Sequence, residues 1–273
     1  MSCLPHSVIL PESESSSVAT SGSTASGWYR IVRRMGQTAH WYLCPWSLMV
    51  PLLLFIGCMS GDMARKQPEG VLRAAFVALD GVYNSELMAP YDVLHHSIFR
   101  DSTNHIEPFV VSPDGDPLVT FEGITVVPHY SFATAPQADI LVIPSTAGSM
   151  DRDLEDANYM NWVRTRAKQA EWVITVCDGA FPLAATGLVD GRRITTFPAD
   201  RDLLAAMFPK VSVRYEERLV IDGKFITSVG GALSYEPALY LVNVLYGKPH
   251  AQQTAEGLVL DWELDRIPHK NFK

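Results

Sequence analysis

The segment that most constrains the fold reads WVITVCDGAFPLAATG and runs from Trp172 to Gly187. Its first five residues are apolar or β-branched, which predicts a buried β-strand. The strand leads directly into Cys177-Asp178-Gly179, and the small residues that follow predict a helix over Ala180–Leu188. A strand, a sharp turn that carries a nucleophile and a helix form the layout called a nucleophile elbow, which presents the nucleophile at the carboxyl end of a sheet.

The chain from Val71 onward alternates between two kinds of pattern. Short apolar runs predict strands, and longer segments with helical spacing predict helices. The predicted strands include 73–79, 106–112, 140–143 and 172–176, and the predicted helices include 86–99, 158–169, 180–188 and 236–246. Strands that alternate with helices favour a mostly parallel sheet covered on both faces. We therefore expect one α/β domain over residues 71–250 and a C-terminal tail over 251–273.

The first 70 residues differ sharply in composition from the rest. Residues 11–27 read PESESSSVATSGSTASG and hold almost nothing to bury. Such a segment cannot offset its own ordering entropy, so a disordered leader is expected over residues 1–34. Basic residues then precede an apolar run, WSLMVPLLLFIG over 46–57, which is the layout of an export signal. A signal or anchor segment is therefore expected over 35–58, and a polar tether over 59–70.

The residues Phe55-Ile56-Gly57-Cys58 resemble a bacterial lipoprotein cleavage site, where a small residue precedes the cysteine that becomes lipidated. Phe55 stands where such sites usually have leucine, and a start at Met35 gives a signal of ordinary length. The apolar run is shorter than the roughly 20 residues that span a bilayer. We expect a lipoprotein attached through Cys58, exported to the periplasm or the cell surface and anchored in the membrane. An uncleaved anchor and an accidental hydrophobic segment are the alternatives.

Composition excludes several classes of protein. The chain has 30 acidic and 22 basic residues, a formal charge of −8, so it lacks the positive charge that nucleic-acid binding requires. Hydrophobic residues make up 47% of the chain, enough for a substantial core. Four cysteines in 273 residues are too few for a disulfide scaffold. The sequence has no metal-ligand cluster, phosphate-binding glycine loop or dinucleotide fingerprint in a suitable context, so no metal or cofactor is expected.

Cys177 is the strongest chemical signal in the sequence. A helix that begins just after the cysteine points its partial positive charge at the sulfur, which favours thiolate over thiol. The alternative is an inert cysteine packed as a small hydrophobic side chain. The position of Cys177 at the end of the strand, followed by Asp-Gly rather than by more apolar residues, favours a reactive cysteine.

Four stretches of the sequence resemble the ThiJ/PfpI family of the class I glutamine-amidotransferase-like superfamily, which includes the parkinsonism-associated deglycase, PfpI-type proteins and isonitrile hydratases. These stretches are ELMAPYDVL over 86–94, DILVIP over 139–144, VCDGAFPLAATGLVDGRRITT over 176–196 and DGKFITSVG over 222–230. The resemblance extends from about Val71 to about Gly247. It implies a flavodoxin-like three-layer sandwich with a nucleophile elbow, a small-molecule substrate or ligand, and a homodimer.

The resemblance also implies roles for individual residues. Cys177 matches the nucleophile, and Glu86 matches an acidic residue whose carboxyl group reaches the sulfur. Backbone N–H groups of Asp178, Thr146 and Ala147 match the donors that hold an oxyanion. An aspartate at 178 departs from the threonine of isonitrile hydratases, and its charge opposes thiolate formation unless it faces solvent or a cation. The loop over 145–148 reads STAG where relatives usually have paired glycines.

Phe197 stands where catalytic relatives with a Cys-His pair have histidine, so the sequence lacks a general base at the usual place. The histidines 95, 96, 105 and 129 are expected to be surface or structural residues. We expect a small-molecule hydratase- or hydrolase-like enzyme that acts through Cys177 with Glu86. The alternative is a non-catalytic redox- or ligand-sensing module. Because little chain follows residue 246, no DNA-binding domain is expected.

Overall fold

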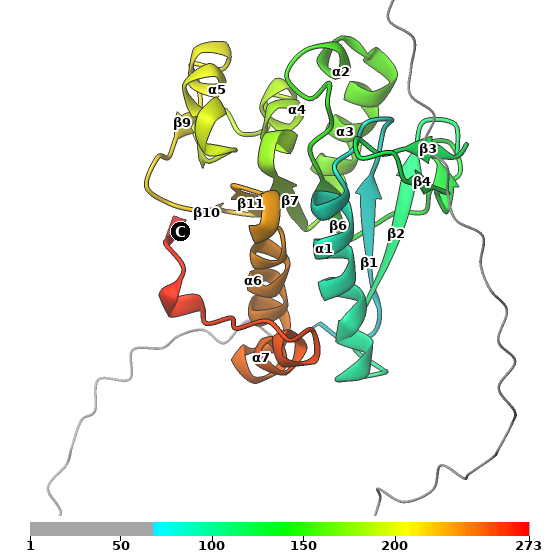
Figure 1. Ribbon diagram of the computed structural model, residues 1–273, viewed down its shortest axis with the longest axis vertical. Coiled ribbons are helices and arrows are strands. Elements are labelled where there is room, and N and C mark those ends of the chain that lie inside the picture. Colours follow the sequence, from blue (N-terminus) through cyan, green and yellow to red (C-terminus); the bar gives the residue numbers. More distant parts are fainter. Residues whose placement is uncertain (1–67, 273) are drawn as a thin grey trace, which may run out of the picture. The chain divides into compact units, whose positions relative to one another are not determined.

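A computed structural model describes residues 68–272, in which strands and helices alternate along the chain (Figure 1). The strands are β1 Leu72–Val77, β2 Ile106–Ser112, β3 Leu118–Val119, β4 Thr125–Val126, β5 Tyr130–Ser131, β6 Ile140–Ile143, β7 Trp172–Val176, β8 Arg193–Ile194, β9 Ser212–Val213, β10 Leu219–Asp222, β11 Phe225–Ser228 and β12 His269–Phe272. Eight of them form one sheet in the order β12-β10-β11-β7-β6-β1-β2-β5. Every neighbouring pair in this sheet is parallel except β10 with β11.

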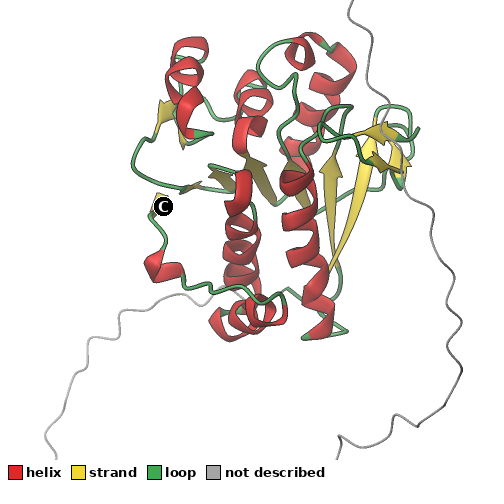
Figure 2. Ribbon diagram, in the orientation of Figure 1, coloured by secondary structure: helices red, strands yellow, loops and turns green. Residues whose placement is uncertain are grey.

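Helices cover both faces of this sheet (Figure 2). The α-helices are α1 Asn84–His95, α2 Arg152–Glu155, α3 Ala157–Gln169, α4 Ala180–Ala185, α5 Arg201–Met207, α6 Tyr235–Tyr246 and α7 Lys248–Gly257. Short 3₁₀ turns are η1 His96–Phe99, η2 Cys177–Gly179, η3 Pro198–Asp200, η4 Gly231–Leu233 and η5 Leu264–Arg266. The architecture is the flavodoxin-like three-layer sandwich expected from the sequence.

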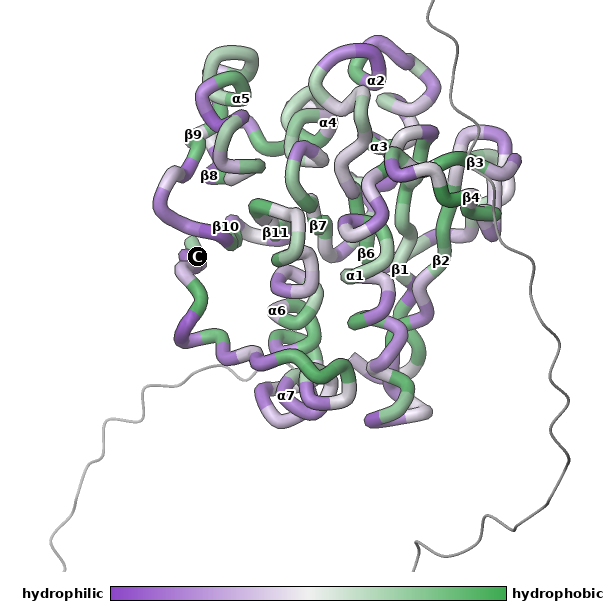
Figure 3. The backbone as a smooth tube through the Cα atoms, viewed as in Figure 1, coloured by the Kyte–Doolittle hydropathy of each residue, from purple (hydrophilic) through white to green (hydrophobic). Residues whose placement is uncertain are grey.

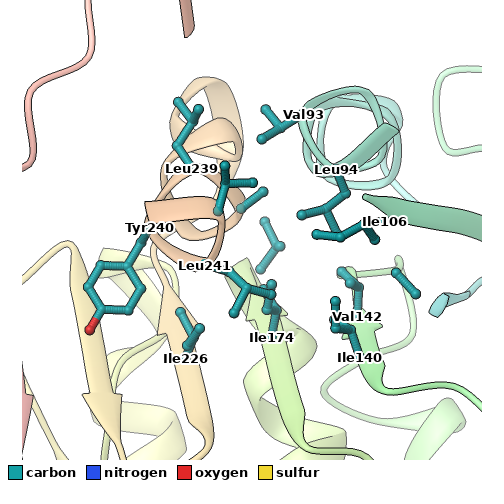
Figure 4. Packing of buried hydrophobic residues seen from close by; sticks show 14 of the residues in the cluster. Val93, Leu94, Ile106, Ile140, Val142, Ile174, Ile226, Leu239, Tyr240 and Leu241 are labelled. Atoms are coloured by element: carbon teal, nitrogen blue, oxygen red, sulfur yellow. The ribbon is translucent and has the colours of Figure 1, made fainter. Parts of the chain in front are cut away.

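Alternation along the strands divides the core into two clusters. In β1, Ala74 and Phe76 belong to the cluster beneath α1, α6 and α7, whereas Ala75 and Val77 belong to the cluster that includes α3, α4 and α5. This follows from the two-residue period of a strand, which sends successive side chains to opposite faces. In Figure 4 the residues of α1 and α6 meet those of the strands in the first cluster. The strand β6 lies at the hydrophobic end of the scale in Figure 3, as a strand buried on both faces requires.

The predicted strands and helices before residue 250 are confirmed in type, with ends shifted by a few residues. The predicted helix over 158–169 begins at Ala157 because Asp156 caps it. The Asp156 carboxylate accepts hydrogen bonds from the backbone N–H groups of Asn158 and Tyr159, at 2.9 and 3.0 Å. The predicted helix over 86–99 is α1 followed by the 3₁₀ turn η1.

The segment 251–273, expected to be a tail outside the domain, is instead part of it as far as the structure describes it. Most of α7 lies within this segment, and β12 pairs in parallel with β10 at the edge of the sheet. Ala255, Trp262 and Ile267 are buried in the first core cluster. Apart from Leu258-Val259-Leu260, the apolar residues of this segment stand singly among polar ones, so the sequence pattern does not predict its packing.

The predicted leader, the signal segment over 35–58 with Cys58, and most of the tether over 59–70 lie outside the described residues. Within residues 68–272, the longest apolar helices are too short or too polar to cross a bilayer.

Candidate active site

The nucleophile elbow at Cys177 is present as predicted. The strand β7 ends at Val176, and Cys177, the first residue of η2, adopts a left-handed backbone conformation with φ of 54°. Positive φ is unfavourable for a residue with a side chain and is held here by the surrounding structure. A Cβ on Gly179 would lie 2.0 Å from the carbonyl oxygen of Ile143, so the turn must carry glycine at that position.

Gly230 packs against the other side of the elbow. It follows β11 with φ of 74°, and a Cβ at this position would lie 2.4 Å from the Cβ of Cys177. The backbone at Gly230 therefore packs directly against Cys177, with no room for a side chain between them. This brings the next residue, Gly231, to the carboxyl group of Glu86, at an N···Oε1 distance of 3.5 Å.

Glu86 reaches the sulfur from the first turn of α1, as the resemblance implied. Its side chain is 4% exposed, is hydrogen-bonded to Cys177, and accepts a hydrogen bond of 3.1 Å from the backbone N–H of Ser145. Burial raises the pKa of Glu86 to about 7, although these hydrogen bonds act in the opposite direction. Near neutral pH the group is therefore present in both its acid and its carboxylate form.

Asp178 turns its carboxyl group toward the nucleophile rather than toward solvent or a cation. The Oδ2 atom lies 3.7 Å from the Cys177 sulfur, and the residue is 8% exposed. The other oxygen, Oδ1, accepts a hydrogen bond of 2.9 Å from the Thr196 hydroxyl, and the backbone N–H of Phe197 is a further donor. Burial raises the pKa of Asp178, while these two donors lower it.

The surroundings of Cys177 favour the thiol, contrary to the expectation from the helix terminus. Burial raises the pKa of Cys177, and the negative charges of Glu86 and Asp178 raise it further. The backbone N–H of Asp178 donates to the sulfur and lowers the pKa, but it does not offset these effects. The helix α4 has 6 residues, so the charge at its terminus is small beside two nearby carboxyl groups.

The predicted oxyanion donors are placed unequally. The backbone N–H of Asp178 points at the sulfur, as stated above. The N–H of Thr146 donates instead to the Ser149 hydroxyl at 2.8 Å, and the N–H of Ala147 donates to the carbonyl oxygen of Gly81 at 2.9 Å. The prediction for Thr146 and Ala147 is therefore wrong for this structure, because the loop satisfies its own donors through internal hydrogen bonds.

The four histidines named from the sequence are engaged away from the sulfur. His95 stacks on Tyr91, His96 lies 3.3 Å from a carboxylate oxygen of Asp92, His105 lies near Glu107, and His129 accepts a hydrogen bond from the backbone of Val110. The side chain of Phe197 is 41% exposed and contributes its backbone N–H, not its ring, to the site.

A pocket of about 650 Å³ lies beside the site. Its lining includes Asn84, Met88, Gly231 and Tyr235, so it adjoins the residue that hydrogen-bonds Glu86. The ring of Tyr83, just before α1, packs at a tilt against that of Phe121, with 4.6 Å between the ring centroids. Burial raises the pKa of the Tyr83 hydroxyl, and the negative charges of Cys177, Glu86 and Asp178 raise it further. Among residues 68–272, histidine, cysteine, aspartate and glutamate form no cluster of three or more suited to a metal ion.

Three residues, Thr196, Gly230 and Gly231, contribute to the site without having been predicted from the sequence. The sequence places Thr196 in a Thr-Thr strand but does not indicate the bond from its hydroxyl to Asp178. Gly230-Gly231 lacks the pattern of a nucleotide-binding loop, so no site is expected there. The useful signal is a glycine directly after a strand that ends beside the elbow, since such a glycine permits close backbone approach.

This geometry defines a class of protein: a flavodoxin-like α/β domain whose nucleophile elbow carries cysteine and whose first helix supplies an acidic partner. The chain belongs to the DJ-1/PfpI family, and the match covers residues 72–243.

Individual relatives agree with this assignment. An isonitrile hydratase of Pseudomonas putida is 31% identical over 181 residues, which are 66% of this chain and 75% of that one. The HTH-type transcriptional regulator CdhR of Pseudomonas aeruginosa is 29% identical over 60% of this chain, which spans 48% of the regulator. A ThiJ/PfpI family protein from Pseudomonas syringae has a similar structure, with a TM-score of 0.64 and 24% identity over 75% of this chain and 81% of its own.

Proposed function

We propose that the protein is an enzyme that adds water to an electrophilic carbon of a small molecule through a covalent adduct on Cys177, in the manner of an isonitrile hydratase. The observation that carries the proposal is the placement of Glu86. A buried carboxyl group with a pKa near 7 is hydrogen-bonded to a nucleophile held at positive φ on an elbow. Such a group is suited to proton transfer at neutral pH. The similarity to an isonitrile hydratase over 75% of that enzyme supports the substrate class.

The reaction requires no histidine. Sulfur bonds to the terminal carbon of an isonitrile, and the acid form of Glu86 gives its proton to the same carbon, which leaves a thioimidate on Cys177. The thiol proton leaves the sulfur as this bond forms and returns to it when the carbon–sulfur bond is cleaved. Water then adds to this carbon; one of its protons passes to the nitrogen, and the other restores the acid form of Glu86. Cleavage of the carbon–sulfur bond releases an N-substituted formamide and restores the thiol. The backbone N–H of Asp178, which already faces the sulfur, stabilises charge near the reacting carbon.

The pocket beside Gly231 supports an apolar substituent on this substrate. Met88, Ile124 and Tyr235 give it apolar walls, whereas Asn84 and Ser85 supply polar groups. An isonitrile is a linear group that reaches a sulfur with little open surface, and Cys177 is 7% exposed.

The alternative, a redox-sensing module, is less favoured by the electrostatics of the site. Oxidation of a sensor cysteine proceeds through the thiolate. Burial, Glu86 and Asp178 all raise the pKa of Cys177, so the thiol is the resting form. An enzyme overcomes this by moving a proton within the site, whereas a sensor needs the thiolate at rest.

The test is turnover of alkyl and aryl isonitriles, with formamide measured by liquid chromatography and mass spectrometry. Cys177→Ser is expected to lower the rate at least about a thousandfold, and Glu86→Gln by roughly 10²–10⁴-fold. Glu236→Gln is a matched control. Glu236 is also a buried acid in the first turn of a helix, but it pairs with Arg218. The absence of turnover with every isonitrile, or equal losses in Glu86→Gln and Glu236→Gln, would contradict the proposal.

We also propose that the protein is exported and attached to the membrane through Cys58. The sequence of residues 35–58 supports this proposal. Labelled palmitate is expected to enter the wild type and the matched control Cys44→Ala, but not Cys58→Ala. Label retained in Cys58→Ala, or absent from the wild type, contradicts attachment. A homodimer is proposed from the family resemblance, and light scattering on the purified chain should give twice its mass.

A further inference from the structure

Two carboxyl groups approach the sulfur of Cys177 from different elements. Glu86 comes from α1 on one side, and Asp178 comes from the elbow itself, with Oδ2 3.7 Å from Sγ. Both are buried, at 4% and 8% exposure. A thiol has one proton, so in the resting state it donates to one of these groups at a time.

The two carboxyl groups are supported differently. Asp178 accepts from the Thr196 hydroxyl and from the backbone N–H of Phe197, both of which stabilise the carboxylate form. Burial raises the pKa of both groups, and it raises that of Glu86 to about 7. The Cys177 thiol is directed at Oδ2 of Asp178, at 3.7 Å. Of two neighbouring acids, the one toward which the thiol is directed is placed to act as base, and the one that holds a proton near neutral pH can act as acid.

We propose that the carboxylate of Asp178 is the general base that takes the proton of the Cys177 thiol, while Glu86 keeps the separate role of proton donor to the substrate. This assignment rests on the function proposed above and completes its proton balance. The S–H bond breaks and the proton moves to Oδ2, so that the sulfur becomes a thiolate and Asp178 a neutral acid. When the adduct is cleaved, Asp178 returns this proton to the departing sulfur.

The charges around Asp178 permit this transfer. The groups around Asp178 are neutral or negative: the Cys177 thiol, the Glu86 carboxyl group and the more distant Asp200. The Tyr83 hydroxyl interacts electrostatically with Asp178 as well. Arg201, in the neighbouring helix α5, is turned toward Thr195 and the carbonyl oxygens of Tyr215 and Glu217. Transfer from sulfur to Asp178 leaves the total charge of the site unchanged, whereas loss of the proton to solvent adds a negative charge.

The test is the pH dependence of Cys177 alkylation by iodoacetamide in the full chain, followed on the peptide that contains Cys177 so that the other cysteines do not interfere. In the wild type the rate should show a flat region, nearly independent of pH, that ends near pH 7 where Glu86 loses its proton, because the internal proton transfer does not involve solvent. In Asp178→Asn the rate should rise about tenfold per pH unit, since the thiol must then ionise to solvent.

The alternatives predict different profiles. If Asp178 acts only through its charge, both proteins show the tenfold slope and Asp178→Asn reacts faster, because a negative charge has been removed. If Glu86 is the base, Glu86→Gln loses the flat region and Asp178→Asn keeps it. Either result overturns the assignment. The assignment expects Glu86→Gln to keep the flat region and to extend it above pH 7.

A second variant tests the assignment even if Asp178→Asn does not fold. Thr196→Val removes the hydroxyl that supports the carboxylate, so the lower end of the flat region should move to higher pH; an unmoved profile overturns the assignment. Alkylation requires no substrate, so the outcome is independent of the proposed function. If the protein hydrates isonitriles but lacks this pH profile, the proposed function stands and the assignment of Asp178 as the base is wrong.

Discussion

Gly230 and Cys177 follow the ends of two neighbouring strands, β11 and β7, and pack directly against each other: a Cβ on Gly230 would lie 2.4 Å from the Cβ of Cys177. Gly230→Ala should therefore destabilise the protein twice over. Positive φ costs an alanine about 1–2 kcal/mol, and overpacking against the elbow adds roughly 1–3 kcal/mol. Urea unfolding measures the loss. Gly231→Ala is the matched control, because Gly231 also has positive φ but a Cβ added there would meet no heavy atom within 4 Å. Equal losses in the two variants would show that the close contact is absent.

Glu86 should make the stability of the fold depend on pH. Its pKa is 4.5 in a free chain and about 7 in the folded protein, so between these values the folded state holds a proton that the unfolded chain releases. The free energy of unfolding therefore falls as pH rises through this window, by about 1.4 kcal/mol per unit and about 3 kcal/mol in total. The difference between wild type and Glu86→Gln, measured by urea unfolding from pH 4.5 to 8, isolates this contribution. A difference that does not change with pH contradicts the raised pKa.

Asp222 should be a larger contributor to stability than an exposed ion pair. It is 7% exposed and accepts from Arg192 at 2.9 Å and from both the backbone and the side chain of Arg193. Asp222→Ala is expected to cost about 2 kcal/mol, because charged hydrogen bonds to a buried acceptor are lost. Lys210→Ala, which breaks the exposed pair with Asp190, should cost less than about 1 kcal/mol. The result that would count against this account is a similar loss in thermal unfolding experiments on both variants.

The chain after residue 250 should contribute to the stability of the domain. Ile267 is buried in the core cluster beneath α6 and α7, so Ile267→Ala should cost roughly 2–5 kcal/mol. Val259 lies in the same stretch but is 92% exposed, with φ of 57°. Val259→Ala should therefore change stability by less than about 0.5 kcal/mol. If neither substitution alters the urea midpoint, this stretch does not pack as described.

The sequence predicted the layers of the fold because its strongest signals are local. The apolar strand β7, the Cys-Asp-Gly turn and the following small residues each favour one local structure, and the protein adopts it. The stretch after residue 250 was not predicted to pack on the domain because Trp262 and Ile267 are single apolar side chains between polar residues. Their burial depends on a sheet edge that the sequence pattern does not display.

The sequence predicted which residues form the site, but not the hydrogen bonds and charges that surround them. The resemblance identified Glu86 and Cys177, which the structure brings together through a hydrogen bond. It did not show that Thr146 and Ala147 use their N–H groups internally. The direction of the Asp178 carboxylate also follows from long-range contacts, above all with Thr196, which is 18 residues further along the chain. Spacing along a sequence does not specify contacts of this kind.

The central claim is that Cys177 bonds covalently to the substrate during turnover. The most direct test is to quench the protein with acid within milliseconds of mixing it with an alkyl isonitrile, and to analyse its peptides by mass spectrometry. The account predicts that the peptide containing Cys177 gains the mass of the intact isonitrile and that Cys177→Ser gains none. Formamide production with no added mass at Cys177, and with turnover retained in Cys177→Ser, would contradict it.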